Sequence, residues 1–536
     1  MFWALVLAGY AFGVGTAMAY YDDHNNILKQ QREIIQKDCH FTRYPSLCVQ
    51  TLLSLKPGSY QYTDVISALV NKTIDESKLP TSDLSMLIMN SQSLGAEEAK
   101  TAQSITGDCE GLMSMSVKRL EQALAGLKKS DPVRNKEDIQ TWLSAALTFQ
   151  QACKDSADGL TLASQLSKKM AYLTELSSNA LALTNSMITG ESSAAAAAAA
   201  DRRLTKEEEI FPKWVSPRDR KLLQSTTINA NAIVAQDGSG NYRTISEAIR
   251  AASGARFVIY VKEGVYKEKI RTNKDGITLI GDGKYSTIIS GDDSVAGGSS
   301  MPGSATFTVT GDRFIARDIG FHNTAGPQGK QALALYIASD HSALYRCSIA
   351  GYQDTLYALA LRQFYRECDI YGTIDFIFGN AAAVFQNCNL ALRRPRDANV
   401  ILASGRSDPG QNTGFSVQNC RIAASSEFAG VKHSYESYLG RPWKAYSRSV
   451  VMQSNIDDAI ASRGWIEWPG YGSSVLSSLY FAEYSNVGPG AGTSQRVKWP
   501  GFHVIGVKDA EKFTVANFIA GNSWLPSTKV TFDSGL

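Results

Sequence analysis

The chain has 536 residues, of which 44% are hydrophobic and 20% are charged. This is the composition of a globular protein with substantial cores, and the length exceeds that of one ordinary domain, so two domains with additional segments are expected. The formal net charge is only +3, and no run of Lys and Arg is long enough to follow nucleic-acid phosphates. Nucleic acid is therefore excluded as an expected partner.

The first 19 residues, MFWALVLAGYAFGVGTAMA, are apolar and have no charged side chain. They end in Ala17-Met18-Ala19, the small-x-small pattern of a secretory cleavage site, so residues 1–19 are predicted to be a signal peptide. The usual Lys or Arg before the apolar run is absent, which makes a retained membrane anchor the alternative interpretation. No later segment has an apolar run long enough to predict a further membrane span.

Residues from about 30 to 188 are predicted to be helical. Segments such as DLSMLIMNSQSLGAEEAKTAQSI and KEDIQTWLSAALTFQQACKDSADGL place apolar residues at three- and four-residue steps, with Gly or Pro between segments. Such amphipathic helices pack as an all-α four-helix bundle, which we place in residues 20–190. Their Met and Leu stripes are typical of a core rather than of a cofactor site.

Residues 191–223 have the composition of a linker, with an alanine tract followed by mixed charges and two prolines. Dibasic pairs lie within Arg202-Arg203-Leu204-Thr205 and within Arg220-Lys221-Leu222-Leu223. Charged pairs in a linker are ordinarily solvated. Because these dibasic pairs lie between two domains of an exported chain, they could equally be sites of proteolytic processing.

The eight cysteines form two groups of four, an early group (Cys39, Cys48, Cys109, Cys153) and a late group (Cys347, Cys368, Cys388, Cys420). An even number in each group predicts two separately bridged domains in an oxidising compartment. None has the CxxC spacing of a zinc site, and the six His residues form no HxxxH or HxH cluster, so no metal is expected. Asn71-Lys72-Thr73 is a glycosylation sequon, in agreement with export.

From about residue 229 the sequence changes to short runs rich in Val, Ile, Phe and Tyr, separated by Gly, Asn and Asp. These runs are typical of short strands. Similar phrases recur 21 residues apart, at Cys347 and Cys368, Gly351 and Gly372, and Asp354 and Asp375. A β-rich repeat of this length without the L-x-x-L-x-L frame predicts an all-β parallel β-helix over residues 224–536.

Stacked coils would place Asp354 beside Asp375, because adjacent parallel strands lie about 4.8 Å apart. The same stacking predicts a Cys347–Cys368 bridge and leaves Cys388 with Cys420, although four cysteines permit three pairings. Two adjacent carboxylates repel, so the pKa of one should rise while a nearby cation keeps the other ionised. This division provides an acid and a base or nucleophile. The structural alternative is that both carboxylates are solvated or bonded to turn backbone.

Further polar residues accompany the two carboxylates. Gln353 adjoins Asp354, Gln331 lies in QALAL one coil earlier, and LGRPW contains Arg441 and Trp443. Amide donors, an acid, a carboxylate and an arginine are the groups needed for acyl transfer through a stabilised oxyanion. Individually, the glutamines could bond turn backbone, the arginine could form a surface ion pair, and the tryptophan could belong to the core.

Five motifs resemble the plant-type pectin methylesterases: GVYKE (264–268), QALAL (331–335), GYQDTL (351–356), DFIFGN (375–380) and LGRPW (439–443). They occur in the family's order, and the resemblance spans residues 229–536. Leu333 stands where the family pattern has Val. The family fold is a right-handed parallel β-helix, in agreement with the repeat.

The resemblance implies a role for each polar residue. Asp375 would be the nucleophile on the methyl-ester carbonyl of a galacturonate unit, and Asp354 would protonate the departing methanol and then activate water. Gln331 and Gln353 would donate to the oxyanion, and Arg441 would orient Asp375 and hold it ionised.

The same resemblance implies that the substrate is methyl-esterified homogalacturonan in the cell wall, with no metal or cofactor, and that the mature enzyme is monomeric. The sugar-contacting aromatic residues would be Tyr357, Phe378, Trp443 and Trp468, beside Gln331 and Arg441. Aromatic faces suit sugars because they pack on the apolar faces of pyranose rings.

The helical segment resembles the invertase and pectin methylesterase inhibitor domain through its four cysteines and TWLSAALTFQQAC. This implies bridges between Cys39 and Cys48 and between Cys109 and Cys153, and a pro-region that restrains the esterase until the linker is cleaved. Arg220-Lys221-Leu222-Leu223 fits the family's processing motif, whereas RRLT departs from it at the fourth place, so cleavage is expected after Leu223. A processing protease and separate inhibitor proteins are the further partners implied.

Three other functions compete with this interpretation. A polygalacturonase or a Ca²⁺-dependent pectate lyase would share the β-helix, but a lyase would need several acidic ligands and an arginine base. A serine esterase is disfavoured because the chain has no G-x-S-x-G. An inhibitor or wall-binding protein with an inert β-helix would not need all five candidate chemical residues.

Overall fold

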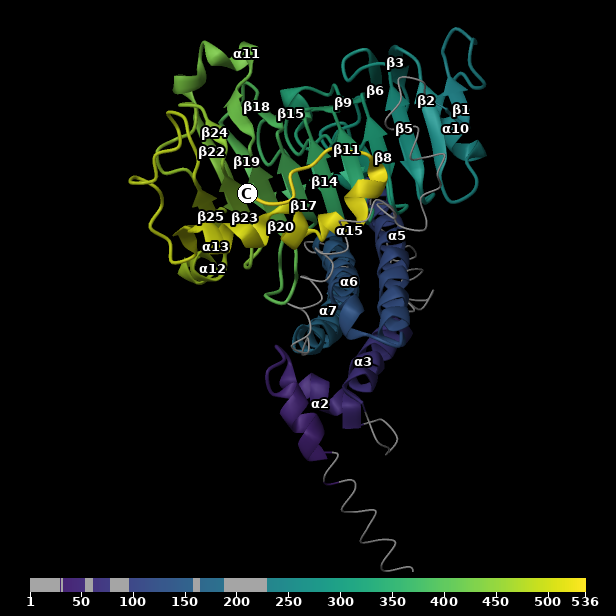
Figure 1. Ribbon diagram of the computed structural model, residues 1–536, viewed down its shortest axis with the longest axis vertical. Coiled ribbons are helices and arrows are strands. Elements are labelled where there is room, and N and C mark those ends of the chain that lie inside the picture. The colour runs from purple at the N-terminus through teal and green to yellow at the C-terminus, as the bar shows by residue number, and fades with distance from the viewer. Residues whose placement is uncertain (1–28, 30–31, 54–60, 78–95, 158–163, 188–228) are drawn as a thin grey trace, which may run out of the picture. The chain divides into compact units, whose positions relative to one another are not determined.

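The computed structural model describes residues 29, 32–53, 61–77, 96–157, 164–187 and 229–536 (Figure 1). Contacts divide the chain into two compact units, residues 1–85 with 116–190 and residues 86–115 with 191–536. The predicted signal peptide (1–19) and both dibasic motifs lie outside the described residues. Within the described residues, no helix is both long and apolar enough to cross a membrane.

The N-terminal region is helical, as predicted. Its described helices are α2 (Pro45–Leu53), α3 (Tyr62–Ser77), α5 (Ala96–Leu127), η1 (Val133–Asn135), α6 (Lys136–Ala157) and α7 (Ser164–Asn185). Helix α6 shows why these segments pack: Ile139, Leu143 and Ala146 recur at steps of four and three and are fully buried. Gln150, at the next step, is also buried, and its amide is satisfied by Ser116 Oγ at 3.2 Å and Ser177 Oγ at 2.9 Å.

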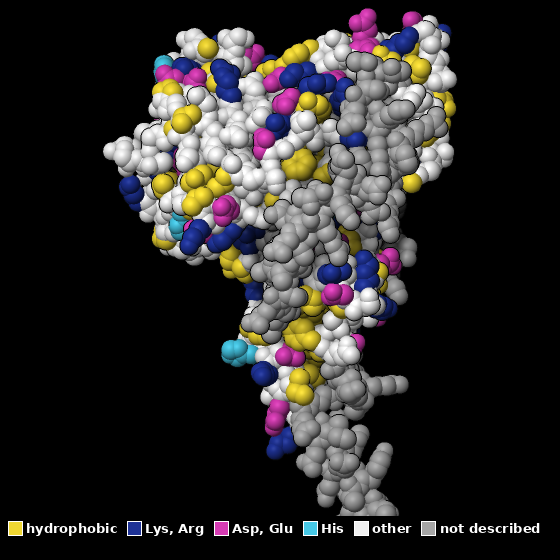
Figure 2. Space-filling view, viewed as in Figure 1, with side chains coloured by type: hydrophobic (Ala, Val, Ile, Leu, Met, Phe, Trp, Pro, Cys, Tyr) yellow, Lys and Arg dark blue, Asp and Glu magenta, His cyan; other side chains and the backbone are white. Residues whose placement is uncertain are grey.

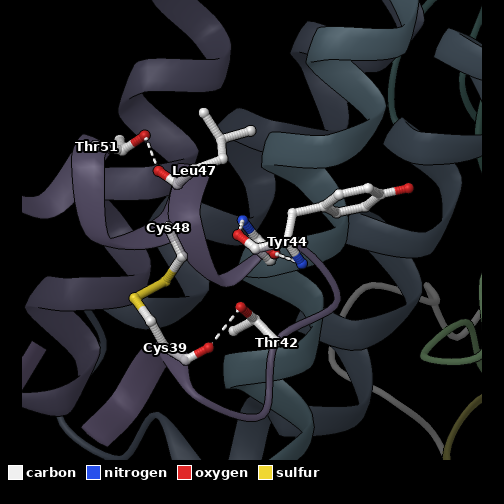
Figure 3. Close-up of a disulfide and its surroundings, with 7 residues drawn as sticks. Cys39, Thr42, Tyr44, Leu47, Cys48 and Thr51 are labelled. Carbon is white, nitrogen blue, oxygen red and sulfur yellow. Dashed lines mark hydrogen bonds between the residues drawn. A yellow bond between two sulfur atoms is a disulfide. The ribbon is translucent and has the colours of Figure 1, made fainter. Parts of the chain in front are cut away.

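A disulfide between Cys39 and Cys48 closes the loop before α2, as the resemblance implied (Figure 3). Thr42 Oγ1 donates to the Cys39 carbonyl at 2.7 Å, and Asn179 of α7 bonds both backbone groups of Tyr44, at 3.0 and 2.9 Å. Cys109 and Cys153 are also disulfide-bonded. All four early cysteines are therefore oxidised, as predicted. The sequon residue Asn71 is exposed on α3, and its glycosylation stays a prediction.

The C-terminal region is a parallel β-helix whose central coils each add one strand to each of three sheets (Figure 1). The eleven-stranded sheet contains β1 (Ala232–Val234), β2 (Phe257–Val261), β5 (Ile277–Gly281), β8 (Ile315–Arg317), β11 (Ser342–Tyr345), β14 (Arg362–Arg366), β17 (Ala382–Gln386), β20 (Gly414–Gln418), β23 (Arg448–Met452), β25 (Tyr480–Tyr484) and β26 (Phe502–Val504).

The eight-stranded sheet contains β3 (Gly264–Lys267), β6 (Thr287–Gly291), β9 (Gly320–Asn323), β12 (Ser348–Ala350), β15 (Asp369–Gly372), β18 (Asn389–Leu392), β21 (Arg421–Ala424) and β24 (Asn455–Ile456). The seven-stranded sheet contains β4 (Ile270–Thr272), β7 (Phe307–Val309), β10 (Leu335–Ile337), β13 (Leu356–Ala358), β16 (Ile377–Gly379), β19 (Ala398–Ser404) and β22 (Glu436–Pro442). Every paired strand in these sheets is parallel to its neighbour, for example β12 to β15 and β13 to β16.

The register confirms the 21-residue interval that the sequence showed. Ser348 pairs with Asp369, and Leu356 pairs with Ile377. Equivalent side chains therefore stack from coil to coil, and the interior contains rows of aliphatic residues. One such row of paired and buried residues comprises Ile349, Ile370, Leu390, Ile422 and Ile456.

The late cysteines correct one prediction. Cys347, Cys368, Cys388 and Cys420 do follow consecutive strands of the eleven-stranded sheet and are buried, but all four are free thiols. The predicted Cys347–Cys368 and Cys388–Cys420 bridges are therefore wrong. The physical reason is that the thiols point at backbone carbonyls of their own corner: Cys368 Sγ lies 3.4 Å from the Arg366 oxygen and Cys420 Sγ 3.3 Å from the Gln418 oxygen.

Short helices cover other parts of the β-helix: α10 (Ile245–Ala251), η3 (Pro302–Ser304), η4 (Pro327–Gly329), α11 (Ser426–Ala429), η5 (Lys432–Ser434), α12 (Ser473–Ser478), α13 (Val507–Ala510), η6 (Glu511–Phe513), α14 (Val515–Phe518), α15 (Gly521–Trp524) and η7 (Leu525–Thr528). The C-terminal helices pack on the outer face of the eleven-stranded sheet, where Val515, Ile519 and Trp524 share a core with Phe364 and Val384 (Figure 1). Basic and acidic side chains are interspersed on the face drawn in Figure 2, in keeping with the small net charge.

Candidate active site

The repeated glycine and aspartate motifs form the corner between the eight-stranded and the seven-stranded sheets. Asp354 lies in the turn from β12 to β13, and Asp375 lies in the equivalent turn from β15 to β16. The Asp354 amide donates to the Ile374 carbonyl at 3.0 Å, which joins the two turns. In the second turn a Cβ on Gly372 would lie 2.1 Å from Phe376 Cβ, so this bend requires glycine.

Both aspartates adopt left-handed backbone conformations, with φ of 60° at Asp354 and 50° at Asp375. Few residues other than glycine adopt this conformation, and strained backbone concentrates at functional sites. Only 8% of Asp354 and 5% of Asp375 is exposed. The turns therefore hold two carboxyl groups side by side in a largely desolvated place, as the stacking predicted.

Arg441, on β22, holds Asp375. Its Nε donates to Asp375 Oδ1 at 2.8 Å and its Nη2 donates to Oδ2 at 2.5 Å. This two-pronged pair is the strongest common geometry between a guanidinium and a carboxylate. The Arg441 guanidinium also lies 4.1 Å from the centre of the Trp468 ring, which fixes the plane of the guanidinium from a second side.

The two carboxyl groups differ in acidity. Burial raises the pKa of Asp375, and the Arg441 guanidinium opposes that rise through hydrogen bonds and charge. Burial, and then the negative charge of Asp375, raise the pKa of Asp354 well above its usual value. The pKa of Asp354 is thus raised more strongly than that of Asp375, so Asp354 binds a proton more readily than Asp375 does.

The two glutamines lie on the same corner, one and two coils before Asp375. Gln331 and Gln353 pair as an isolated parallel bridge, and the Ala332 amide donates to the Gln353 carbonyl at 3.2 Å. The Val295 amide donates to the Gln331 carbonyl at 2.9 Å, which fixes Gln331 from the preceding loop. The two glutamines are thus neighbours on adjacent coils, and Gln353 directly precedes Asp354.

Aromatic rings line the outer face of the seven-stranded sheet beside the carboxyl groups. The Tyr357 and Phe378 rings stack with centroids 4.3 Å apart, and Trp443 packs against both, at 6.4 and 5.9 Å. A Cβ on Gly405 would lie 2.8 Å from the Trp443 ring, so this ring rests directly on the neighbouring backbone. The structure brings together all nine predicted site residues: Gln331, Gln353, Asp354, Tyr357, Asp375, Phe378, Arg441, Trp443 and Trp468.

Comparison with known proteins identifies the family to which the chain belongs. The pectinesterase family profile matches residues 231–522, which include the whole candidate site. The chain belongs to the pectinesterase family. It is therefore an esterase that acts on carboxylic esters. The profile of the plant invertase/pectin methylesterase inhibitor family matches residues 33–183, within the helical region.

Two plant relatives match this pectinesterase over most of its length. It is 49% identical over 494 residues to a probable pectinesterase/pectinesterase inhibitor (number 54) of Arabidopsis thaliana, covering 90% of this chain and 89% of that protein. It is 48% identical to pectinesterase 2 of Citrus sinensis, covering 83% and 87%. Among solved structures, pectin methylesterase from carrot shares 50% identity with a TM-score of 0.57, covering 58% of this chain and 100% of that one.

Two residues of the pectinesterase site were not found from the sequence. Tyr336 packs against Tyr357 in a tilted arrangement, with ring centroids 5.1 Å apart. It precedes Tyr357 by the same 21 residues that separate Tyr357 from Phe378, so extending the repeat by one coil would have revealed it.

The second is Arg393, which braces both catalytic turns. Its guanidinium lies 3.8 Å from the centre of the Tyr352 ring, and its Nη1 donates to the Gly351 carbonyl at 3.1 Å. Its backbone amide donates to the Gly372 carbonyl at 2.9 Å. Nε and Nη2 donate to Glu427 at 2.7 and 3.2 Å, and the arginine lowers the pKa of Glu427. No repeat or motif marks this residue, because its contacts come from three separate segments of the chain.

The described residues contain no group of three or more His, Cys, Asp or Glu side chains placed to hold a metal ion. The acidic residues of the site are instead engaged with Arg441 or with one another. The side chains gathered at this site supply two carboxyl groups, two amides and a guanidinium.

Proposed function

We propose that the protein hydrolyses methyl esters of homogalacturonan in pectin, and that it releases methanol and free galacturonate carboxylates. The geometry of the two aspartates supports this most directly. Asp375 is buried and held by Arg441, and the neighbouring Asp354 has the more strongly raised pKa. An ionised nucleophile beside a proton donor is what ester cleavage through an acyl-enzyme needs. The similarity to pectin methylesterase from carrot supports the choice of substrate.

In the first half of the reaction, an Asp375 oxygen attacks the ester carbonyl carbon. The carbonyl oxygen becomes an oxyanion, to which the side-chain amides of Gln331 and Gln353 donate. As the tetrahedral intermediate collapses, the carbon–methoxy bond breaks and Asp354 gives its proton to the methoxy oxygen. Methanol leaves, and the galacturonate carbonyl remains joined to Asp375 as an anhydride.

In the second half, Asp354 is ionised and accepts a proton from a water molecule that attacks the same carbonyl carbon. The bond to Asp375 breaks, and Asp375 leaves as a carboxylate that Arg441 stabilises. The product is a free galacturonate carboxyl group, and Asp354 is protonated again. The net reaction consumes one ester and one water and yields one acid and one methanol.

We further propose that Tyr357, Phe378, Trp443 and Trp468 contact the sugar rings on either side of the reacting unit. The stacked pair of Tyr357 and Phe378 presents apolar faces beside the carboxyl groups, and such faces pack well on pyranose rings. Removal of one of these rings should therefore raise KM more than it lowers kcat.

We also propose that residues 20–190 act as a pro-region that restrains the esterase, and that cleavage after Leu223 releases it. Support comes from the inhibitor-family match over residues 33–183 and from the dibasic motif in the linker at 191–223. The proposed place of action is the cell wall, reached through the signal peptide at 1–19. The disulfides of the helical region agree with an oxidising route.

The proposed function is tested by measuring methanol release from highly methylated pectin. The full chain should be compared with the same protein after limited proteolysis, with mass spectrometry locating the cut. We expect the cleaved protein to release methanol at least about tenfold faster, with the new N-terminus following Leu223. Absence of methanol from both forms would contradict the esterase function, and equal rates would contradict the restraining role alone.

Arg393 gives a separate prediction about positioning. In Arg393→Met the bonds to Gly351 and Glu427 are lost, so the turn bearing Gln353 and Asp354 should shift slightly. Because small misplacements of catalytic groups are costly, we expect kcat to fall about tenfold or more while KM changes little. Glu427→Gln is the matched control. It removes the ion pair but leaves the bond from Arg393 to the Gly351 carbonyl, so kcat should fall less than in Arg393→Met. A rise in KM at constant kcat would show that Arg393 binds substrate instead.

A further inference from the structure

Thr355 lies at the junction of the two catalytic turns. It follows Asp354 directly and is fully buried. Its hydroxyl oxygen lies 3.1 Å from the Tyr352 carbonyl oxygen in its own turn, and 3.1 Å from the Tyr371 carbonyl oxygen on β15, the strand that leads into the Asp375 turn. The hydroxyl hydrogen is thus shared between carbonyl groups of two coils.

Backbone amides donate to the same two carbonyl groups. The Thr373 amide of the second turn donates to the Tyr352 carbonyl at 2.9 Å, and the Gly351 amide of the first turn donates to the Tyr371 carbonyl at 3.2 Å. Each carbonyl therefore accepts a bond from the neighbouring coil, and the Thr355 hydroxyl lies between the two. The hydroxyl and the two amides together tie one catalytic turn to the other.

Glycine on both sides makes room for this hydroxyl. A Cβ on Gly351 would lie 2.8 Å from Thr355 Oγ1, and a Cβ on Gly372 would lie 2.9 Å from the same atom. A larger residue at either position would therefore displace the hydroxyl. The two glycines that recur in the sequence keep a space for the threonine at the point where the turns meet.

The backbone conformation of Asp354 explains why such a link is needed. Its φ of 60° is uncommon for a residue with a side chain and persists where the surroundings impose it. The bond from Thr355 Oγ1 to the Tyr352 carbonyl closes the turn around Asp354. Because β13 pairs with β16, Phe376 occupies in the second turn the place of Thr355, and it has no hydroxyl to close that turn. Thr355 holds the second turn instead, through Tyr371.

We propose that Thr355 is a positioning residue, whose hydroxyl keeps the Asp354 turn and the Asp375 turn at the separation that ester cleavage needs. This inference rests on the function proposed above. In that reaction Asp375 attacks the ester carbon while Asp354 serves the methoxy oxygen on the same carbon, so both carboxyl groups must reach one ester together. Small displacements of either group are costly to the rate.

The chain contains a matched site without catalytic groups. Thr306 directly precedes β7, as Thr355 directly precedes β13, and is likewise buried. Its Oγ1 donates to the carbonyl of His322 on β9 at 3.0 Å, and a Cβ on Gly291 would lie 2.8 Å from that Oγ1. Thr306 therefore repeats the local geometry of Thr355 in a turn that has none of the proposed catalytic residues.

The test measures kcat and KM for methanol release by the cleaved protein, together with the melting temperature of each variant. Thr355→Val keeps the shape of the side chain and removes the donor, so we expect kcat to fall about tenfold or more while KM changes little. Thr355→Ser keeps the donor but leaves a methyl-sized gap, so it should lose stability and yet retain most of kcat. Thr306→Val should lose about as much stability as Thr355→Val and keep the wild-type kcat.

Several outcomes would overturn the proposal. One is a wild-type kcat in Thr355→Val, and another is a serine variant as slow as the valine variant, because the hydroxyl would then not be the deciding group. An equal fall of kcat in Thr306→Val would assign the effect to packing. If Thr355→Val does not fold, Thr355→Ala compared with Thr355→Ser isolates the hydroxyl, and equal kcat values in these two would also overturn the proposal. These outcomes leave the proposed function standing, whereas a wild type that releases no methanol contradicts the function and this inference with it.

Discussion

Asp375→Asn should abolish methanol release, lowering kcat/KM by at least about 10⁴-fold. The amide has nearly the same shape as the carboxylate but is a very poor nucleophile, so the acyl-enzyme cannot form. Asparagine also tolerates the left-handed backbone that Asp375 adopts, with φ of 50°. The variant should therefore fold, and methanol release and circular dichroism measured on the same preparation separate lost chemistry from lost structure.

Two further variants sharpen this result. Asp369→Asn alters an acidic residue of the same coil that pairs with Lys284 at 2.6 Å on the eight-stranded sheet, and it should retain activity. The asparagine side chain can hydrolyse slowly back to aspartate, which would restore part of the methanol release. Asp375→Ala is a second variant in which this reaction is impossible. Methanol release by Asp375→Ala within tenfold of the wild type would remove Asp375 from the mechanism.

Asp354→Asn should lower kcat about 10²–10⁴-fold, the usual contribution of general acid–base catalysis. The substituted amide cannot give a proton to methoxide or take one from water. Arg441 and Asp375 stay in place, so the substrate should still bind and KM should change little. Release of methanol at each pH from 4 to 8 measures this, and the wild-type rate should fall as pH rises through the raised pKa of Asp354.

The same substitution should increase stability, and more so at higher pH. Burial and the charge of Asp375 raise the folded-state pKa of Asp354, whereas in the unfolded chain an aspartate ionises near pH 3.9. Between these two pKa values the unfolded chain has lost the proton and the folded protein retains it, so wild-type stability declines as pH rises. Asparagine does not titrate and avoids that loss.

Thermal unfolding of wild type and Asp354→Asn provides the check. The two melting temperatures should agree near pH 3.5, and the variant should melt higher at pH 7, by on the order of a few degrees. A difference that is constant across this range would show that Asp354 titrates normally in the folded protein. That result would also weaken its assignment as the proton donor.

Much of the site could be predicted from the 21-residue repeat interval in the sequence. The 21-residue interval places Asp354 beside Asp375, and it also aligns Tyr336, Tyr357 and Phe378. In a stacked fold, equal intervals along the chain become neighbouring positions in space, so a repeat predicts contacts directly. The helical character of the N-terminal region was equally predictable, because apolar residues at steps of three and four require one buried face.

The cysteines show where this kind of prediction ends. The interval correctly places Cys347 next to Cys368 on consecutive coils, yet both are free thiols that point at backbone carbonyls. A repeat determines which residues share a corner, but the direction of each side chain depends on the rotamer that the packed interior allows. The early cysteines lack such a repeat, and for them the family resemblance indicated the correct oxidation state.

The sequence alone determined the coil length, the stacking of the two carboxyl groups and the residue types available for ester cleavage. Only the tertiary structure decided how the two aspartates differ, because that depends on Arg441, 66 residues from Asp375 along the chain. It likewise decided that Arg393 braces both turns, through its bonds to the Gly351 and Gly372 carbonyls. The reason is physical: pKa values and hydrogen bonds depend on distances between side chains, and distances between remote residues exist only once the coils are stacked.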